Sequence, residues 1–65
     1  DDDSALIYER LEEAGGFLPY HDKSEPQMIK KEFQMSKNAF KRAIGRLMKE
    51  GKIRITDTGI SKIES

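Results

Sequence analysis

Residues 36–63 decide the fold, and they read SKNAFKRAIGRLMKEGKIRITDTGISKI. The first half predicts a helix over 37–50, because Ser36 can cap it by accepting a hydrogen bond from a free backbone N–H of the first turn. Gly51 ends this helix, since glycine readily adopts the left-handed backbone found just after a helix. At 100° per residue, four apolar side chains fall on one side of the helix and are predicted to enter the core: Phe40, Ala43, Ile44 and Leu47.

The second half of this stretch predicts a β-hairpin. Residues 52–56 alternate polar and apolar side chains, which is typical of a strand with one buried face. Asp57, Thr58 and Gly59 are predicted to form a three-residue turn, with the glycine at a position that tolerates a positive φ. The chain then returns over 60–63 as the partner strand.

The chain upstream predicts another helix and a short strand. Ser4 is positioned to cap this first helix, which the pair Gly15-Gly16 ends. Its apolar side is predicted to consist of Ile7, Leu11 and Ala14. Residues 17–20 are too few for a further helix, and Pro19 suits an edge strand because it donates no backbone hydrogen bond.

A further helix is predicted just before residue 36. Ser24 is expected to cap it, with Gln27 completing a capping box. Pro26 falls in the first turn, where its missing N–H does no harm. The helix is predicted to run to about Phe33 and to bury this residue together with Ile29. A tight two-residue link then joins it to the next helix.

The predicted order is helix, short strand, helix, helix, strand, strand. This order indicates a small α+β fold of the winged helix-turn-helix type, with three helices, a C-terminal β-hairpin wing and a short extra strand. Residues 1–65 are expected to form a single domain, in which residues 1–3 are a linker. The abrupt start at Asp1 leads us to expect a fragment cut at a domain boundary.

Composition narrows the function classes. Hydrophobic residues make up 35% of the chain and charged residues 37%, which allows one compact core and no deep catalytic pocket. The chain has no cysteine, so disulfides and thiolate metal sites are excluded. No apolar run approaches the roughly 20 residues of a membrane span. We therefore expect neither an enzyme nor a membrane-bound protein.

Charge is divided unevenly along a chain whose total is zero, with 12 Lys and Arg against 12 Asp and Glu. Residues 36–56, the basic segment, carry seven cations against Glu50 alone, a net charge of +6. Residues 1–35 carry nine acids and four bases, a net charge of −5. A basic patch attracts phosphates at short range. A merely solvated Lys/Arg face would give the same pattern, so charge by itself leaves both interpretations open.

The polar side of the third helix strengthens the phosphate interpretation. In a helix-turn-helix, the N-terminal residues of this helix reach nucleic acid; Asn and Arg can contact base edges, and Lys meets phosphates. Lys52 and Arg54 extend the basic segment onto the wing. The candidate nucleic-acid-binding residues are Lys37, Asn38, Lys41, Arg42, Arg46, Lys49, Lys52 and Arg54.

Gly45 lies in the middle of this cationic side, where glycine costs about 1 kcal/mol of helix stability relative to alanine. Close approach of a phosphate or a sugar would explain a bare backbone here. A tolerated surface glycine, or packing against a neighbouring domain, would explain it as well.

Other residues argue against duplex DNA and against base stacking. The wing tip, Asp57-Thr58, is acidic and poorly suited to a DNA groove. Aromatic residues for stacking are few. The three phenylalanines are predicted to lie in the core: Phe17, Phe33 and Phe40. The two tyrosines that could stand free are Tyr8 and Tyr20, of which Tyr20 is the better candidate.

A metal or catalytic site has little support in the sequence. His21, Asp22 and Glu25 could together form a histidine–carboxylate metal site, but this chain has one histidine and no clear further ligand. Asp22 and Ser24 are more simply residues that organise the loop before the second helix. We expect no catalytic residue, no metal and no cofactor.

The sequence resembles the C-terminal winged-helix domain of the conserved virulence factor B family over about residues 5–60. Two segments together carry the resemblance. The first comprises Gly15-Gly16-Phe17-Leu18-Pro19, His21-Asp22-Lys23-Ser24 and Pro26. The second comprises Met35-Ser36-Lys37 and Ala39-Phe40-Lys41-Arg42-Ala43-Ile44-Gly45. Two positions depart from the family pattern. Gln34 stands where a glycine would ease the turn between helices, which predicts slight strain. Met48 stands where an aromatic is usual, and it is predicted to fill a gap in the core.

Family members are bacterial cytoplasmic RNA-binding proteins with tandem OB-fold modules before this domain. The resemblance therefore implies a cytoplasmic C-terminal fragment of a multidomain regulator of gene expression, including virulence genes. It also implies RNA as the partner, and neighbouring OB-fold domains of the same chain as further contacts. Because A-form RNA hides its major groove from side chains, single strands are favoured over duplexes.

Two alternatives remain at this stage. Winged helices also serve as protein–protein or interdomain interaction modules, and the basic side could dock on an acidic surface. A DNA-binding transcription factor domain is the second alternative, although no dimerisation helix is visible. Fold alone does not choose among these functions.

Overall fold

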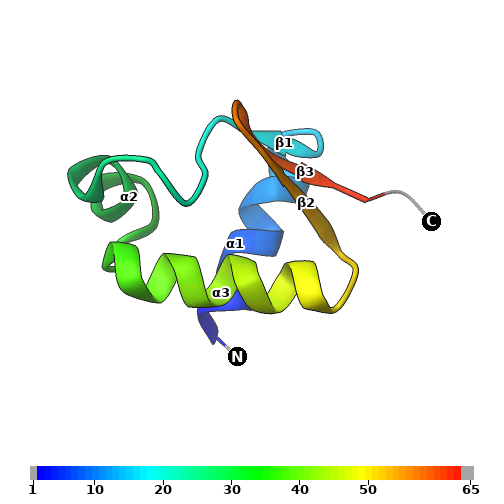
Figure 1. The fold of residues 1–65 in the computed structure, drawn as a ribbon, viewed down its shortest axis with the longest axis horizontal. Helices are drawn as coiled ribbons and strands as arrows, with labels where there is room; N and C mark the ends of the chain where they lie inside the picture. Colours follow the sequence, from blue (N-terminus) through cyan, green and yellow to red (C-terminus); the bar gives the residue numbers. More distant parts are fainter. Residues whose placement is uncertain (1, 64–65) are drawn as a thin grey trace.

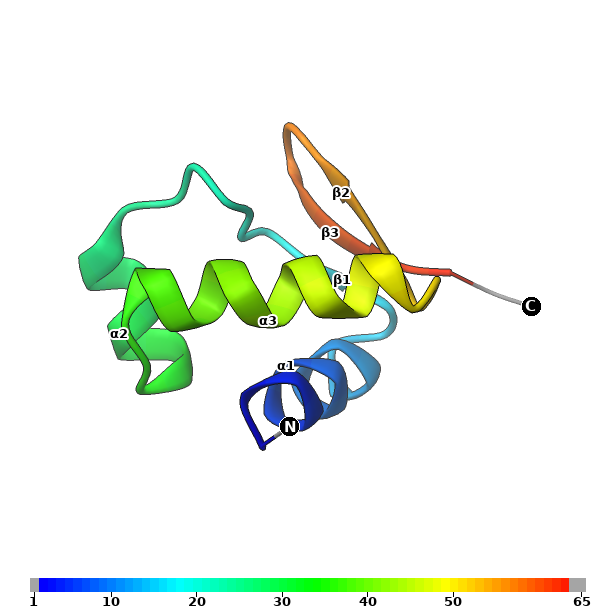
Figure 2. The ribbon, with the colours of Figure 1, turned by 60° about the horizontal axis from the view of Figure 1, so that its bottom comes forward.

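The computed structural model describes residues 2–63, which form three helices and three strands in the predicted order. The elements are α1 (Asp2–Glu13), β1 (Phe17–Leu18), α2 (Pro26–Phe33), α3 (Lys37–Lys49), β2 (Ile53–Thr56) and β3 (Gly59–Lys62). Figure 1 shows α3 lying across the molecule, with α2 near its N-terminal end and the sheet above its C-terminal half. In Figure 2, α1 lies beneath α3, against which it packs. The α+β winged helix-turn-helix prediction is confirmed.

The three strands form one antiparallel sheet in the order β1-β3-β2. β1 is therefore an edge strand, as the proline after it predicts. In the hairpin, Thr56 pairs with Gly59, so the turn has two residues, Asp57 and Thr58, and not the three that we predicted. In another row of the sheet, Phe17, Ser61 and Arg54 lie side by side.

The core receives a side chain from every element, which is how a chain of this size buries enough apolar surface to fold. Rings of α2 and α3 form its centre: Phe33 and Phe40 stack with ring centroids 5.2 Å apart. The buried apolar residues are Ile7, Leu11, Leu18, Ile29, Phe33, Met35, Phe40, Ala43, Ile44, Leu47, Ile53 and Ile60. Among the described residues, no helix combines the length and apolar character that crossing a bilayer requires.

The start of α1 differs from the prediction. Asp2 and Asp3 form the first turn of the helix and are not part of a linker; residue 1 lies outside the described residues. Acidic side chains are stabilising in the first turn because they lie near the positive end of the helix dipole. Ser4 consequently lies inside the helix and is buried, so it is not the cap that we predicted.

The start of α2 also differs in its cap. Pro26 opens the helix as predicted, but the N-cap is Glu25, whose side chain makes no capping hydrogen bond. Ser24 serves the loop instead, because its hydroxyl accepts a hydrogen bond from the backbone N–H of His21 at 2.9 Å. The predicted capping box of Ser24 and Gln27 is therefore wrong.

Two turns depend on the residue type at one position: the link between α2 and α3 at Gln34, and the β-hairpin at Gly59. Gln34, between α2 and α3, has φ 54° and ψ 37°, the left-handed conformation that glycine adopts at no cost. The strain predicted at this position is confirmed. Gly59 is required for space: a Cβ there would overlap the carbonyl oxygen of Leu18 and lie 2.9 Å from Cζ of Phe17. The edge strand approaches β3 this closely only because residue 59 lacks a side chain.

Three apolar residues predicted to be buried are exposed. Ala14, predicted on the apolar side of the first helix, lies one residue beyond α1 and is exposed. Phe17 is 43% exposed, because its ring covers Gly59 from the solvent side of the sheet and does not enter the core. Met48 is 51% exposed on α3 and fills no core gap. The other two phenylalanines, Phe33 and Phe40, are buried as predicted.

Candidate nucleic-acid interface

The solvent side of α3 is the candidate interface, and its local sequence explains its geometry. The Ser36 hydroxyl accepts a hydrogen bond from the N–H of Ala39 at 3.1 Å, so the predicted cap is confirmed. The helix ends at Lys49, one residue before the predicted end, and Gly51 follows with φ 75°. The four predicted apolar residues are all buried, which turns the opposite side of α3 toward solvent.

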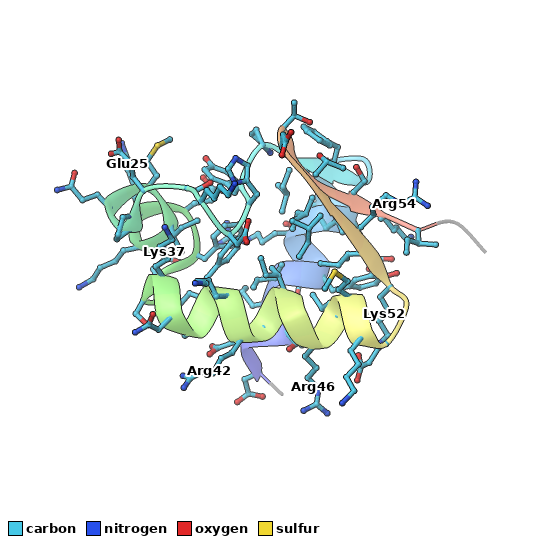
Figure 3. The ribbon with its side chains drawn as sticks, viewed as in Figure 1. Glu25, Lys37, Arg42, Arg46, Lys52 and Arg54 are labelled. Atoms are coloured by element: carbon cyan, nitrogen blue, oxygen red, sulfur yellow. The ribbon has the colours of Figure 1, made fainter. Side chains whose placement is uncertain are left out.

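This solvent side is cationic throughout. α3 contains five Lys and Arg residues and no acidic residue. Asn38, Lys41, Arg42 and Lys49 are exposed, as predicted from the helical spacing. Figure 3 shows Arg42 and Arg46 projecting from α3 on the side away from the sheet.

Three of the eight candidate residues lie away from this solvent side. Lys37 is half-buried and projects on the side of α3 opposite to Arg46, toward the loop that precedes α2 (Figure 3). Arg54 lies on the outer face of the sheet, and Lys52 lies at the turn between α3 and β2 (Figure 3). The structure therefore brings together Asn38, Lys41, Arg42, Arg46 and Lys49.

Glu50 divides the cations into paired and unpaired groups. Its carboxylate lies 3.4 Å from Nε of Arg46 and 3.7 Å from Nζ of Lys52. In the described part of the chain, no ion pair holds Lys41, Arg42 or Lys49. Among the cations on the solvent side of α3, these three can meet an anion without first giving up a carboxylate.

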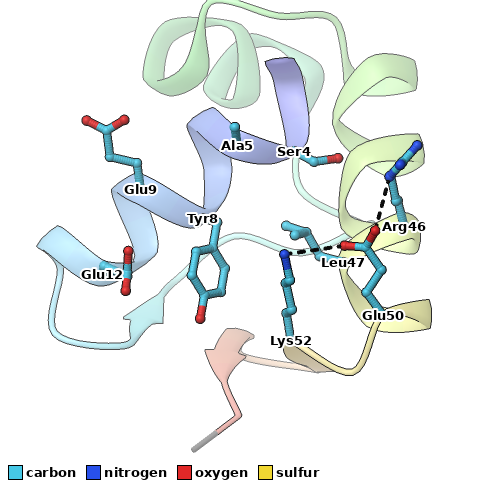
Figure 4. A pocket seen from close by; sticks show the side chains of 9 residues that line it. All are labelled: Ser4, Ala5, Tyr8, Glu9, Glu12, Arg46, Leu47, Glu50 and Lys52. Atoms are coloured by element: carbon cyan, nitrogen blue, oxygen red, sulfur yellow. Dashed lines mark hydrogen bonds and ion pairs between the residues drawn. The ribbon is translucent and has the colours of Figure 1, made fainter. Parts of the chain in front are cut away.

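A groove between α1 and the end of α3 holds a second charged cluster, which the sequence did not reveal (Figure 4). The ring of Tyr8 forms its centre, with Nζ of Lys52 and Nζ of Lys62 each 5.7 Å from the ring centroid. Lys62 also pairs with Glu12 at 3.2 Å. The groove is lined by Ser4, Ala5, Tyr8, Glu9, Glu12, Arg46, Leu47, Glu50 and Lys52.

This groove is a structural contact between the wing and α1 and not an anion site. Its lining carries three carboxylates against two cations, and Nζ of Lys62 lies over the same Tyr8 ring, so the charges balance and the groove offers a phosphate no net attraction. Tyr8, which we expected to stand free, is partly buried beneath the two lysines. The sequence did not indicate this cluster because both lysines are far from Tyr8 along the chain: Lys52 directly precedes β2, and Lys62 is the last residue of β3.

Tyr20 is also held in place and cannot serve as a free stacking ring. Its ring meets Phe33 edge-on at 5.5 Å, and its hydroxyl donates a hydrogen bond to Glu32 at 3.3 Å. Partial burial, and secondly the carboxylate of Glu32, raise the pKa of Tyr20 above its usual 10.0. The expectation that Tyr20 is available for a base is therefore wrong.

His21 has a structural task in the loop before α2. Its Nδ1 accepts a hydrogen bond from the N–H of Lys23 at 3.0 Å and lies 4.0 Å from a carboxylate oxygen of Asp22. Across residues 2–63, no group of three or more His, Asp or Glu side chains is arranged to hold a metal ion. The alternative metal site with Glu25 is thus not formed.

Gly45 lies in a shallow hollow on the solvent side of α3. We call it the Gly45 hollow; its lining is Arg42, Gly45, Arg46, Lys49 and Glu50. A Cβ at residue 45 would meet nothing within 4 Å. Packing within this domain therefore does not require glycine here.

Comparisons with known proteins identify the family of this domain. The model of the CvfB-like winged helix domain family matches residues 5–61. The chain is 50% identical to Conserved virulence factor B of Staphylococcus aureus strain MRSA252 and 47% identical to that of strain USA300, over alignments that cover the whole chain. It spans 24% of the length of these relatives.

A solved structure shows the same fold. It is the crystal structure of a multidomain protein with nucleic acid binding domains from Streptococcus pneumoniae TIGR4, 44% identical to this chain with a TM-score of 0.95. The match covers 97% of this chain and 22% of that protein. Family model, sequence identity and fold agree over nearly the whole chain, which therefore belongs to the CvfB-like winged helix domain family.

Proposed function

We propose that this domain is a non-catalytic nucleic-acid-binding module that prefers RNA and contacts its backbone through the solvent side of α3. The observation that carries the proposal is the group of unpaired cations on a helix without acidic residues: Lys41, Arg42 and Lys49. Phosphate contacts from such a group supply affinity and depend on salt, because binding releases counterions. Asn38, at the N-terminal end of this side, can donate and accept hydrogen bonds with a base or a sugar.

One feature of the structure argues against duplex DNA as the partner. The wing tip consists of exposed Asp57 and Thr58, and its carboxylate would face phosphates if the wing lay along a duplex. The relative from Streptococcus pneumoniae is described as having nucleic acid binding domains, which supports nucleic acid as the partner. The preference for RNA rests on the resemblance to the family. Within a longer protein of this family, the domain would add phosphate contacts to those of neighbouring OB-fold modules, in a cytoplasmic regulator of gene expression.

The test is fluorescence anisotropy of this chain with labelled single-stranded RNA, duplex RNA and duplex DNA over a salt series. For single strands, the slope of log K against log salt should be about −0.7 for each phosphate contacted. The variant Lys41→Glu with Arg42→Glu should abolish binding while circular dichroism shows native helicity, because both residues are exposed.

The matched control is Lys30→Glu with Lys31→Glu. Both residues are exposed on α2, and the variant changes the net charge by the same amount. It should retain most of the affinity. Equal loss in both variants would show that only net charge matters, and retained binding in the α3 variant would refute the assignment of α3.

A second candidate function, contact with a neighbouring domain, is favoured by the outer face of the sheet. Phe17 and Ile63 are both exposed there, beside Arg54. Exposed apolar residues grouped on a sheet face are typical of interaction surfaces. In a longer protein that contains this chain, Ile63→Ser would then increase the radius of gyration measured by small-angle X-ray scattering; an unchanged value would exclude this contact.

A further inference from the structure

Gly45 is unfavourable for the helix that contains it, and the fold supplies no reason for it. Alanine is the better helix former, and a Cβ at this position would extend into open space. Gly45 is also absent from the residues with positive φ, so its backbone conformation is one that any residue adopts. A residue that is unfavourable for its own helix, and that no packing contact requires, indicates a functional role.

The side chains around Gly45 repel one another when no anion is present. Its neighbours at positions −4, −3, +1 and +4 on the helix are Lys41, Arg42, Arg46 and Lys49. Arg42 and Arg46 are four residues apart, and Arg46 and Lys49 are three apart. These spacings bring side chains together on one helix surface, where like charges destabilise a helix. Glu50 neutralises the Arg46 edge of the hollow, which leaves Arg42 and Lys49 facing solvent on the other edges.

We propose that the Gly45 hollow binds one phosphodiester group of the nucleic-acid strand, an inference that rests on the proposed function of α3. The bare Cα lets the phosphate oxygens approach the helix about 1.5 Å closer than a methyl group would allow. At that depth, Arg42 from the preceding turn and Lys49 from the following turn both reach the same group. The guanidinium can donate two parallel hydrogen bonds to phosphate, and the ammonium adds a point charge.

The experiment compares Gly45→Ala and Gly45→Leu with the unsubstituted chain, by anisotropy against single-stranded RNA, duplex RNA and duplex DNA. Gly45→Ala should raise the melting temperature by about 4–8 °C, since it removes the helix cost of glycine, and yet weaken binding by several-fold. Gly45→Leu should fill the hollow and reduce the magnitude of the salt slope by about 0.7 on single-stranded RNA, the value for one lost phosphate.

The matched control is Met48→Ala, which changes an exposed residue of α3 that does not line the hollow. It should leave both the affinity and the salt slope unchanged. A variant that becomes more stable and binds more weakly cannot be explained by damage to the fold, so Gly45→Ala keeps the proposal testable even if leucine disturbs the helix.

The outcomes separate this inference from the function on which it rests. If the unsubstituted chain binds and both Gly45 variants bind equally well with the same slope, the phosphate site is wrong and the function of α3 stands. If the unsubstituted chain binds none of the three nucleic acids, both are wrong. Stronger binding of duplex DNA, with the same dependence on Gly45, would keep the phosphate site and overturn the preference for RNA.

Discussion

Replacing Glu50 with glutamine should strengthen nucleic-acid binding. Glu50 is the one acidic residue of the basic segment, and its carboxylate holds Arg46 at 3.4 Å and Lys52 at 3.7 Å. Arg46 lies on the solvent side of α3 and Lys52 lies at the turn that follows the helix, and each must leave this carboxylate before it can meet a phosphate. The glutamine side chain has nearly the same shape but no charge, and it therefore removes both ion pairs together, while Lys52 keeps its contact with the Tyr8 ring.

The magnitude follows from the exposure of the three side chains, which is 56% for Arg46, 39% for Glu50 and 53% for Lys52. Ion pairs this exposed are screened by water and contribute about 0.2–0.5 kcal/mol each, the low end of the measured range. Two such pairs correspond to about 0.4–1 kcal/mol, or a twofold to fivefold gain in affinity. Stability should change little, because an acid at the C-terminal end of a helix is itself unfavourable.

The assay is anisotropy with labelled single-stranded RNA at several salt concentrations. The control is Glu13→Gln, which changes net charge equally but removes a carboxylate on α1 that has no ion pair in the described part of the chain. Glu50→Gln should gain more affinity than Glu13→Gln and show a steeper salt slope. An equal gain in both variants would mean that Arg46 and Lys52 are not at the interface, and the reasoning would fail.

Two further predictions concern the fold that presents α3. Gly59→Ala should destabilise the protein by about 3 kcal/mol, the upper end of the cost of overpacking, because its Cβ would overlap the backbone carbonyl of Leu18; urea unfolding measures this, and an unchanged midpoint would show that β1 moves aside freely. Gln34→Gly should raise the free energy of unfolding by about 0.5–1 kcal/mol, since glycine removes the left-handed strain but loses the hydrogen bond from Nε2 of Gln34 to the carbonyl of Lys31. A lower melting temperature in this variant would show that the side-chain hydrogen bond outweighs the strain.

The order of helices and strands could be predicted from the sequence because the spacing of apolar residues shows which side of each element is buried. The apolar spacing of α3 identified its four buried residues, and the alternation over 52–56 identified β2. Caps were less predictable, because a serine hydroxyl has several possible donors nearby. Ser36 bonds to its own helix, Ser24 bonds back to His21, and Ser4 lies inside α1.

Exposure of individual apolar and aromatic residues could not be predicted in the same way. Phe17 lies on the solvent face of an edge strand of two residues, too short to show alternation. Tyr20 lies in a loop, where no period indicates which way a side chain points, and only packing against Phe33 holds it. Met48 fits a core by its chemistry, yet its angle on α3 turns it toward solvent.

Residue spacing was enough to predict that this chain forms a winged helix and that one side of its third helix is cationic, because helix geometry depends only on that spacing. The tertiary structure decided which of those cations are unpaired. Arg46 and Lys52 meet at Glu50 because the chain turns back into β2 at the end of α3, and Arg54 points away because the pleat of the sheet places it on the outer face. Such ion pairs depend on the distances between helices and strands, and these distances cannot be read from the spacing of residues along the chain.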